Sequence, residues 1–240
     1  MKKFKIKSYA KINLALHVTG KKVKLHKIES LVSFIELHDL IYLKQIKKKN
    51  HKVSFKGKFS KNIQKINTLT NLLKLLDQKN LLENKKFEIK VVKNIPQKAG
   101  MGGGSMNAAS LIDFFIKRKI LKLNQIEIIK ITNQIGSDVI LGIKPSNTIL
   151  LPNNKIKKYK KNIRLHTLVV KPHFGCSTKD IYSKIKSFSK AQFKGPMEKL
   201  FKAKYLKDFN NDLEIISFKK YPTLKKIKLF LLTIPNSIFV

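Results

Sequence analysis

The chain has 240 residues, of which 42% are hydrophobic, so it can bury a core as one compact unit or as two small, closely packed domains. It contains no apolar run of about 18 residues, which argues against a membrane span, and its single cysteine, Cys176, cannot form an internal disulfide. Lysines alternate with apolar residues at the start, unlike the continuous apolar core of a signal peptide. We therefore expect a soluble, cytoplasmic protein.

The charge balance is extreme, with 52 Lys+Arg against 14 Asp+Glu and a formal net charge of +38. One interpretation is a nucleic-acid-binding protein, because a basic surface attracts polyphosphate. However, only Arg118 and Arg164 are arginines, so 52 − 2 leaves 50 lysines, and these are spread along the whole chain. Arginine grips phosphate better than lysine does. Composition bias is the favoured explanation, since the abundant Lys, Ile, Asn and Phe all have AT-rich codons and Trp is absent; we expect no specific nucleic-acid partner.

Extended structure is predicted for the first third of the chain. Polar and apolar residues nearly alternate over residues 8–18, and residues 26–37 and 40–45 are two further strand candidates. Residues 46–66 are rich in lysine and asparagine and include Gly57, which is typical of a hairpin or an irregular surface segment.

Helices and strands are both predicted for the middle of the chain. Four leucines at the helical spacing i, i+3, i+4, i+7 predict a helix: Leu69, Leu72, Leu73 and Leu76. Apolar residues that alternate with polar ones then predict a strand: Phe87, Ile89 and Val91. Helices are then expected over residues 105–119 and 124–134, the second with Asn124 as its N-cap. Gly136 ends that helix, and Asp138 lies in the turn after it.

A domain boundary is predicted in the polar stretch of residues 152–163, which begins with Pro152. Beyond it we expect a strand at 165–170, a helix over 177–186 capped by Ser177 or Thr178, helical segments at 206–218 and 224–228, and a strand at 230–233. This mixture indicates an α+β fold rather than alternating βαβ units, with domains at 1–152 and 153–240.

The stretch "NIPQKAGMGGGSMNAASLI", residues 94–112, stands out because it holds four of the ten glycines, at Gly100 and Gly102 to Gly104. Glycine allows positive φ and close approach to a ligand. A glycine-rich loop that enters a helix N-terminus presents N–H groups and the positive end of the helix dipole to an anion. The stretch therefore predicts either a phosphate-binding loop or only a flexible connector between a strand and a helix. It matches neither the Walker A nor the Rossmann pattern.

The form of this loop resembles the phosphate loop of the GHMP small-molecule kinases, with an ending "GGGSMNAA". Four other segments resemble that family and occur in its order: "SYAKINLALHVTGKK" at 8–22, "IGSDVILGI" at 135–143, "VVKPHFGCSTKDIYS" at 169–183 and "FNNDLEII" at 209–216. The resemblance implies the two-domain α+β GHMP kinase fold. The glycine loop and Asp138 would lie in the N-terminal domain.

The resemblance also implies roles for particular residues. Asp138 matches the catalytic aspartate and Lys11 its partner lysine: a carboxylate can take or orient the proton of an acceptor hydroxyl, and a lysine beside it offsets negative charge. Asn13 and His26 match positions that touch the substrate, and Tyr182 matches an aromatic that stacks on a cytosine ring. ATP, with Mg²⁺, would be bound by the loop, namely by Pro96, Gln97, Lys98, Ala99, Gly100, Met101, Gly102, Gly103, Gly104, Ser105 and Asn107.

The activity implied is ATP-dependent phosphorylation of the 2-hydroxyl of 4-diphosphocytidyl-2-C-methyl-D-erythritol, in the non-mevalonate isoprenoid pathway, by a monomer or homodimer. Three alternatives stay open: a sibling kinase acting on homoserine or mevalonate, a basic nucleic-acid-binding protein on a relic fold, and a folded but weakly active or inactive remnant that binds ATP. Without the resemblance, Lys11 is one of 50 lysines and Asp138 a turn residue.

The chain departs from the family pattern at four places. Lys24 and Leu25 precede His26 where Gly-Tyr is usual, so an aromatic against the cytosine is lost; Lys98 replaces a small residue or glycine; and Met106 replaces a serine. The last glycine-rich segment is lost around residues 234–236, and we expect the C-terminal domain to be shortened, which raises the possibility of low activity or stability.

Overall fold

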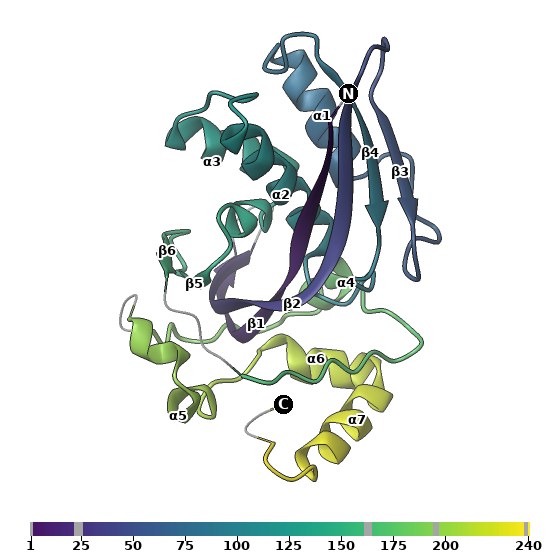
Figure 1. Cartoon of the computed structure of the whole chain (residues 1–240). Helices are drawn as coiled ribbons and strands as arrows, with labels where there is room; N and C mark the ends of the chain where they lie inside the picture. Colours follow the sequence, from purple (N-terminus) through teal and green to yellow (C-terminus); the bar gives the residue numbers. More distant parts are fainter. Residues whose placement is uncertain (1, 22–25, 161–164, 194–196, 238–239) are drawn as a thin grey trace. The chain divides into compact units, whose positions relative to one another are not determined.

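The structure is a computed structural model that describes residues 2–21, 26–160, 165–193, 197–237 and 240 (Figure 1). The chain forms two compact units. Unit 1 comprises Met1–Lys11, Phe34–Gln97 and Met101–Pro145, and unit 2 comprises Ile12–Ser33, Lys98–Gly100 and Ser146–Val240. The predicted division at residues 152/153 stays a prediction.

The sheet of unit 1 is built on the second half of a long strand. Strand β2 (His26–Ile46) pairs antiparallel with β4 (Lys86–Val92), from Leu40 opposite Val92 to Ile46 opposite Lys86. Strand β3 (Lys52–Lys56) pairs with β4 in parallel. Residues 26–37 and 40–45 are both extended, as predicted, but the expected break between them was wrong, because His38 and Asp39 continue the same strand. The hairpin alternative for 46–66 was also wrong, since β3 pairs in parallel with β4.

Helices α1 (Thr68–Gln78) and α2 (Gly103–Lys117) contribute much of the core of unit 1, with α3 (Gln125–Ile135) and the short 3₁₀ helix η1 (Val139–Gly142) beside them. The predicted apolar face of α1 is confirmed, because the four leucines that predicted it, Leu69, Leu72, Leu73 and Leu76, are buried against the core of unit 1. The N-cap prediction for Asn124 is also confirmed: its side chain accepts from the N–H of Glu127, whose carboxylate accepts from Asn124 N–H in return.

Unit 2 contains the other half of β2 and the C-terminal part of the chain. Ser30 to Val32 pair antiparallel with β5 (Asn147–Leu150), which pairs with β6 (Ile156–Tyr159). The hydrogen-bonded strand order is β3-β4-β2-β5-β6, with β1 (Lys3–Lys21) paired to β2. The remaining elements of unit 2 are α4 (Thr178–Tyr182), η2 (Glu198–Phe201), α5 (Ala203–Leu206), α6 (Leu213–Lys220) and α7 (Pro222–Leu232).

Several C-terminal predictions were wrong. Residues 165–170 form no strand, and Leu168 is 70% exposed, because an apolar run becomes a strand only where a partner strand is available to pair with it. The expected strand at 230–233 is instead the last turn of α7, which Pro222 starts at its first position. The helix expected over 177–186 is confined to α4, and that expected over 206–218 is split between α5 and α6.

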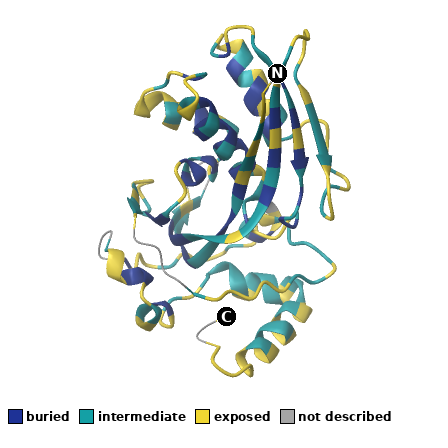
Figure 2. Ribbon diagram, viewed as in Figure 1, coloured by how far each residue is buried: buried dark blue, intermediate teal, exposed yellow. Residues whose placement is uncertain are grey.

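Burial differs between the two units (Figure 2). Unit 1 has one large core cluster, whereas that of unit 2 is small and includes Leu31, Ile149 and Phe193. Neither α6 nor α7, all of whose residues the structure describes, contains a buried residue. No helix in the described part of the chain is long and apolar enough to cross a membrane.

Candidate active site

The glycine loop enters α2 with an uncapped N-terminus. Gly102 is the N-cap residue, with φ 66° and ψ 15°, and no side chain caps the helix. The first N–H groups of a helix have no partner within the helix, and the dipole makes this end positive. The first turn also carries no acidic residue. The backbone of Gly103, Gly104 and Ser105 is therefore suited to binding an anion, as the loop composition predicted.

Lys11 and Asp138 lie together against this loop. Lys11 Nζ is 3.3 Å from Asp138 Oδ2, and Lys11 N–H donates to the carbonyl of Met101 at 3.2 Å. A methyl group added at Gly102 would lie 2.9 Å from Cγ of Lys11, so only glycine leaves room for the lysine stem. The Lys11 side chain is 8% exposed and that of Asp138 35% exposed. An ion pair with one accessible carboxylate is thus placed beside the anion-binding helix end.

The first half of the loop has mixed roles. Pro96 is buried, and Gln97 donates through Nε2 to the carbonyls of Phe59 and Lys61 at 2.7 and 2.8 Å. Gln97 therefore holds a neighbouring turn of unit 1. In unit 2, Lys98 has φ 52°, a left-handed conformation that glycine adopts without cost and lysine does not. This conformation is a physical reason for the glycine or small residue that the family pattern has where this chain has Lys98.

Met106 and Ser105 differ in what they face. Met106 is 1% exposed, and a methyl group added at Gly142 would lie 2.9 Å from its sulfur. Its side chain therefore fills the contact between α2 and η1. Ser105 Oγ would lie 3.9 Å from a methyl group added at Gly136, which ends the helix before Asp138. The hydroxyl of Ser105 is thus on the side of the loop where Asp138 lies.

Asn107, included among the expected ATP-binding residues, is 2% exposed and donates through Nδ2 to Asp39 Oδ2 at 3.1 Å. Sequence reasoning missed Asp39 and its partner Lys93. One feature of the sequence could have pointed to a buried role for Asp39: it is one of only 14 acidic residues, and the apolar residues Leu40 and Ile41 follow it directly.

The residues expected to bind the acceptor lie in unit 2. The rings of His26 and Tyr182 are 5.1 Å apart between centroids and tilted by 35°, so the structure brings together two residues from β2 and α4. Burial, followed by the charge of Lys21, lowers the pKa of His26 below its ordinary value. Asn13 donates through Nδ2 to Ser30 Oγ at 2.7 Å, and Ser30 donates to the carbonyl of Ala15. Lys24 and Leu25 lie outside the described residues.

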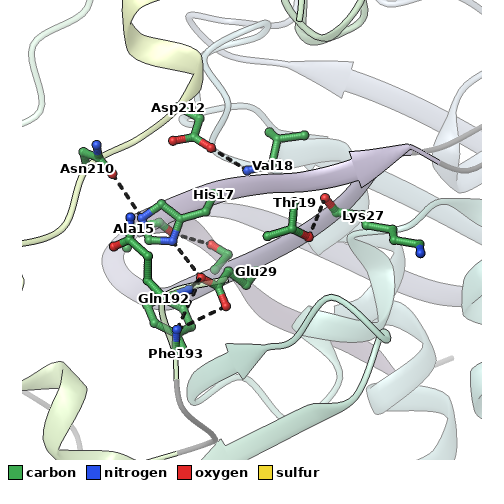
Figure 3. A network of polar contacts seen from close by, with 11 residues as sticks. Ala15, His17, Val18, Thr19, Lys27, Glu29, Gln192, Phe193, Asn210 and Asp212 are labelled. Carbon is green, nitrogen blue, oxygen red and sulfur yellow. Dashed lines mark hydrogen bonds and ion pairs between the residues drawn. The ribbon is translucent and has the colours of Figure 1, made fainter. Parts of the chain in front are cut away.

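A buried polar network holds these strands of unit 2 (Figure 3). His17 Nδ1 is 3.0 Å from Glu29 Oε1, and His17 Nε2 is 3.1 Å from Asn210 Oδ1. Both His17 and Glu29 are fully buried. Glu29 also accepts from the N–H groups of Gln192 and Phe193. Sequence reasoning missed this network, because its members are up to 193 residues apart.

The segment "FNNDLEII" has a structural role within this network. Asp212 Oδ2 accepts from Val18 N–H at 2.7 Å, and Leu16 exchanges backbone hydrogen bonds with Asn210 and Asp212. The segment therefore pins the part of β1 that follows Asn13. This contact accounts for one of the family-like segments without assigning it to catalysis.

Unit 1 also contains a pocket of about 630 Å³ between β3 and α1, which sequence reasoning missed. Its wall includes Val53, Phe55, Asn67 and His51. His51 Nδ1 accepts from the N–H of Phe87, and burial lowers the pKa of His51 despite the nearby carboxylate of Asp77.

Comparison with known proteins decides the family. The model of the GHMP kinases N terminal domain matches residues 67–146, the stretch that includes α1, the glycine loop and Asp138. A 4-diphosphocytidyl-2-C-methyl-D-erythritol kinase from Pelagibacter ubique is 65% identical over 240 residues, covering 100% of this chain and 85% of the relative. The chain belongs to the 4-diphosphocytidyl-2-C-methyl-D-erythritol kinase family.

More distant members of this kinase family agree. A Thermoanaerobacter pseudethanolicus relative of the same name is 30% identical over 238 residues, covering 95% of this chain and 80% of the relative. The crystal structure of a 4-(cytidine 5'-diphospho)-2C-methyl-D-erythritol kinase matches 95% of this chain and 82% of its own, with a TM-score of 0.67 at 18% identity. This likeness confirms the predicted α+β GHMP kinase fold. The chain is shorter than each of these relatives.

Proposed function

We propose that this protein transfers the γ-phosphoryl group of ATP to the 2-hydroxyl of 4-diphosphocytidyl-2-C-methyl-D-erythritol, a step of the non-mevalonate isoprenoid pathway. The observation that carries the proposal is the Lys11–Asp138 ion pair against Gly102, at the uncapped N-terminus of α2. The 65% identity to a kinase of that name supports the choice of acceptor.

ATP fits the loop, because the N-terminal N–H groups of α2 suit its phosphates and Gly102 leaves the backbone open to them. We assign this binding to residues 96–105 of the loop, with Asn107 supporting it from beneath. The pocket between β3 and α1 is where we place the base of ATP, because Thr68, the first residue of α1, approaches Gly104. Mg²⁺ would neutralise phosphate charge, and Ser105 offers a hydroxyl oxygen of the kind that this ion accepts as a ligand.

Asp138 is assigned to the acceptor hydroxyl. Its partly exposed carboxylate can accept the hydrogen bond of that hydroxyl and take its proton as the new oxygen–phosphorus bond forms and the bond from the γ-phosphorus to the leaving ADP breaks. Lys11 holds the carboxylate in place and offsets the negative charge of the moving phosphoryl group. In unit 2, Tyr182 and His26 are assigned to the cytosine ring by stacking and by hydrogen bonding, and Asn13 to the acceptor as well.

The alternatives make different predictions. An inactive remnant binds ATP without turnover, a nucleic-acid-binding protein shows tight and steeply salt-dependent binding to DNA or RNA, and a sibling kinase prefers homoserine or mevalonate. A homoserine kinase from Cytophaga hutchinsonii matches with a TM-score of 0.53 at 13% identity, which shows the fold alone. A cytoplasmic location and a monomeric or homodimeric state stay predictions.

The deciding experiment is a steady-state assay with ATP, Mg²⁺ and each of the three candidate acceptors, with Asp138→Ala and Asp208→Ala as matched variants. Asp208 is an exposed aspartate of unit 2 outside the proposed site. We expect the wild-type chain to phosphorylate 4-diphosphocytidyl-2-C-methyl-D-erythritol, hereafter the cytidylyl acceptor. We expect kcat to fall about 10²–10⁴-fold in Asp138→Ala and to stay at the wild-type value in Asp208→Ala. A folded wild-type chain that binds ATP but turns over no acceptor would refute the proposal.

A further inference from the structure

Asp39 is a fully buried carboxylate with four hydrogen-bond donors around it. Its Oδ1 accepts from the backbone N–H groups of Asn94 and Ile95, both at 2.8 Å. Its Oδ2 accepts from Lys93 Nζ and from Asn107 Nδ2. Lys93 and Asn107 are 4% and 2% exposed. Burying a charge is costly unless it is paired and fully hydrogen-bonded, and this arrangement meets both conditions.

The four donors come from both ends of the glycine loop. Asn94 and Ile95 immediately precede Pro96, where the loop leaves β4, and Asn107 lies in the second turn of α2, just after the loop ends. Asn94 is tied to the same strand a second time, because its Nδ2 donates to the carbonyl of His38 at 2.9 Å. One carboxylate on β2 therefore joins the entrance and the exit of the loop.

Lys93 forms an ion pair with Asp39 in this anchor. A methyl group added at Gly103, the first residue of α2, would lie 3.1 Å from Lys93 Nζ. The ammonium group thus lies beneath the helix end, where Asp39 neutralises it; without Asp39 the lysine charge would be buried and unpaired beside the loop.

We propose that Asp39 is a positioning residue for the phosphate loop: it fixes the spacing between the end of β4 and the N-terminus of α2 without touching substrate. The loop needs such an anchor because Lys98, Gly100 and Gly102 all have positive φ, and a segment with two flexible glycines loses much conformational entropy when it is ordered. This inference rests on the proposed role of the loop in binding ATP.

The test compares Asp39→Asn with Asp113→Asn. Asp113 is a matched control, because it is also a buried carboxylate of unit 1 and accepts a backbone N–H, that of Lys144, at 2.7 Å, but away from the loop. Binding of a non-hydrolysable ATP analogue and of the cytidylyl acceptor is measured by calorimetry, well below the melting temperature of each variant. We expect Asp39→Asn to weaken analogue binding roughly tenfold or more and to leave acceptor binding unchanged; Asp113→Asn lowers only the melting temperature.

A second variant, Asp39→Asn with Lys93→Met, tests the hydrogen bonds themselves. The introduced amide can still accept from the N–H groups of Asn94 and Ile95. It can donate to Asn107 once the Asn107 amide turns over and presents Oδ1, which has no hydrogen-bond partner among the described residues, in place of Nδ2. With the lysine charge also removed, we expect most of the affinity for the analogue to return. Affinity for the analogue within twofold of the wild type in Asp39→Asn, or no recovery in the double variant, would overturn the proposal. The measurement needs no turnover, so a failed kinase assay does not decide it.

Discussion

The proposed phosphate-binding residues of unit 1 and the proposed cytosine-binding residues of unit 2 are held in different ways. In unit 1 the proposed phosphate-binding groups belong mostly to the backbone, at a helix N-terminus and a glycine with positive φ, and the ion pair of Lys11 and Asp138 is beside them. In unit 2 the residues proposed to bind the acceptor are side chains of β1, β2 and α4. Buried hydrogen bonds from segments distant in sequence hold these strands (Figure 3).

This difference affects how each region can fail. Backbone conformation depends on local residue type, so a single methyl group can damage the proposed phosphate-binding groups of unit 1. The proposed cytosine-binding residues of unit 2 depend on partners far apart in sequence, so their weak points are buried polar groups such as Glu29, away from any proposed ligand contact. Buried polar networks of this kind are costly when only partly satisfied.

The largest effect is expected for Glu29→Ala. The change leaves His17 and the N–H groups of Gln192 and Phe193 without their acceptor, and breaking a buried pair of this kind costs about 3–5 kcal/mol of unfolding free energy. Denaturant unfolding measures it, with Glu198→Ala, an exposed carboxylate of the same unit, as the control. In calorimetry at low temperature, acceptor affinity should fall while affinity for an ATP analogue is kept. Equal loss of both affinities would show that the two regions are not held separately.

A smaller effect is expected for Gly102→Ala, with Gly100→Ala as its matched control. Both glycines have positive φ, 66° and 70°, so both changes cost about 1–2 kcal/mol of backbone strain. Only at Gly102 does the added methyl group meet Lys11, at 2.9 Å, whereas nothing lies within 4 Å at Gly100. We expect kcat/KM to fall about 10²-fold for Gly102→Ala and clearly less for Gly100→Ala. Similar losses in both variants would contradict the contact with Lys11 as the cause.

The smallest effect is a pH dependence confined to binding of the acceptor. The pKa of His26 lies below its ordinary value of 6.5, so the imidazole is neutral at pH 7 and becomes protonated only as the pH falls below that value. A neutral imidazole both accepts and donates a hydrogen bond, whereas the protonated ring only donates. The KM for the acceptor should therefore be constant from about pH 8 to 7 and rise several-fold at about pH 5. In His26→Gln, the KM for the acceptor should not rise at low pH. The assignment would be contradicted if the KM for ATP rose in parallel in the wild type and this rise also disappeared in His26→Gln.

The prediction was most successful where the signal is local. The apolar face of α1, the Asn124 cap and the glycine-rich entry to α2 each depend on residues within a few positions of one another, and the structure has all three. The strand prediction failed at residues 165–170 and 230–233, because pairing depends on partners that a local pattern does not reveal.

The sequence by itself determined the family, through its glycine loop and the ordered segments around it, and it determined which lysine and which aspartate to examine. Only the tertiary structure decided that Lys11 packs on Gly102, that Asp39 joins both ends of the loop, and that His17 contacts both Glu29 and Asn210. The physical reason is range: φ preferences, caps and helical periodicity act over a few residues, whereas these contacts join residues 12 to 193 positions apart.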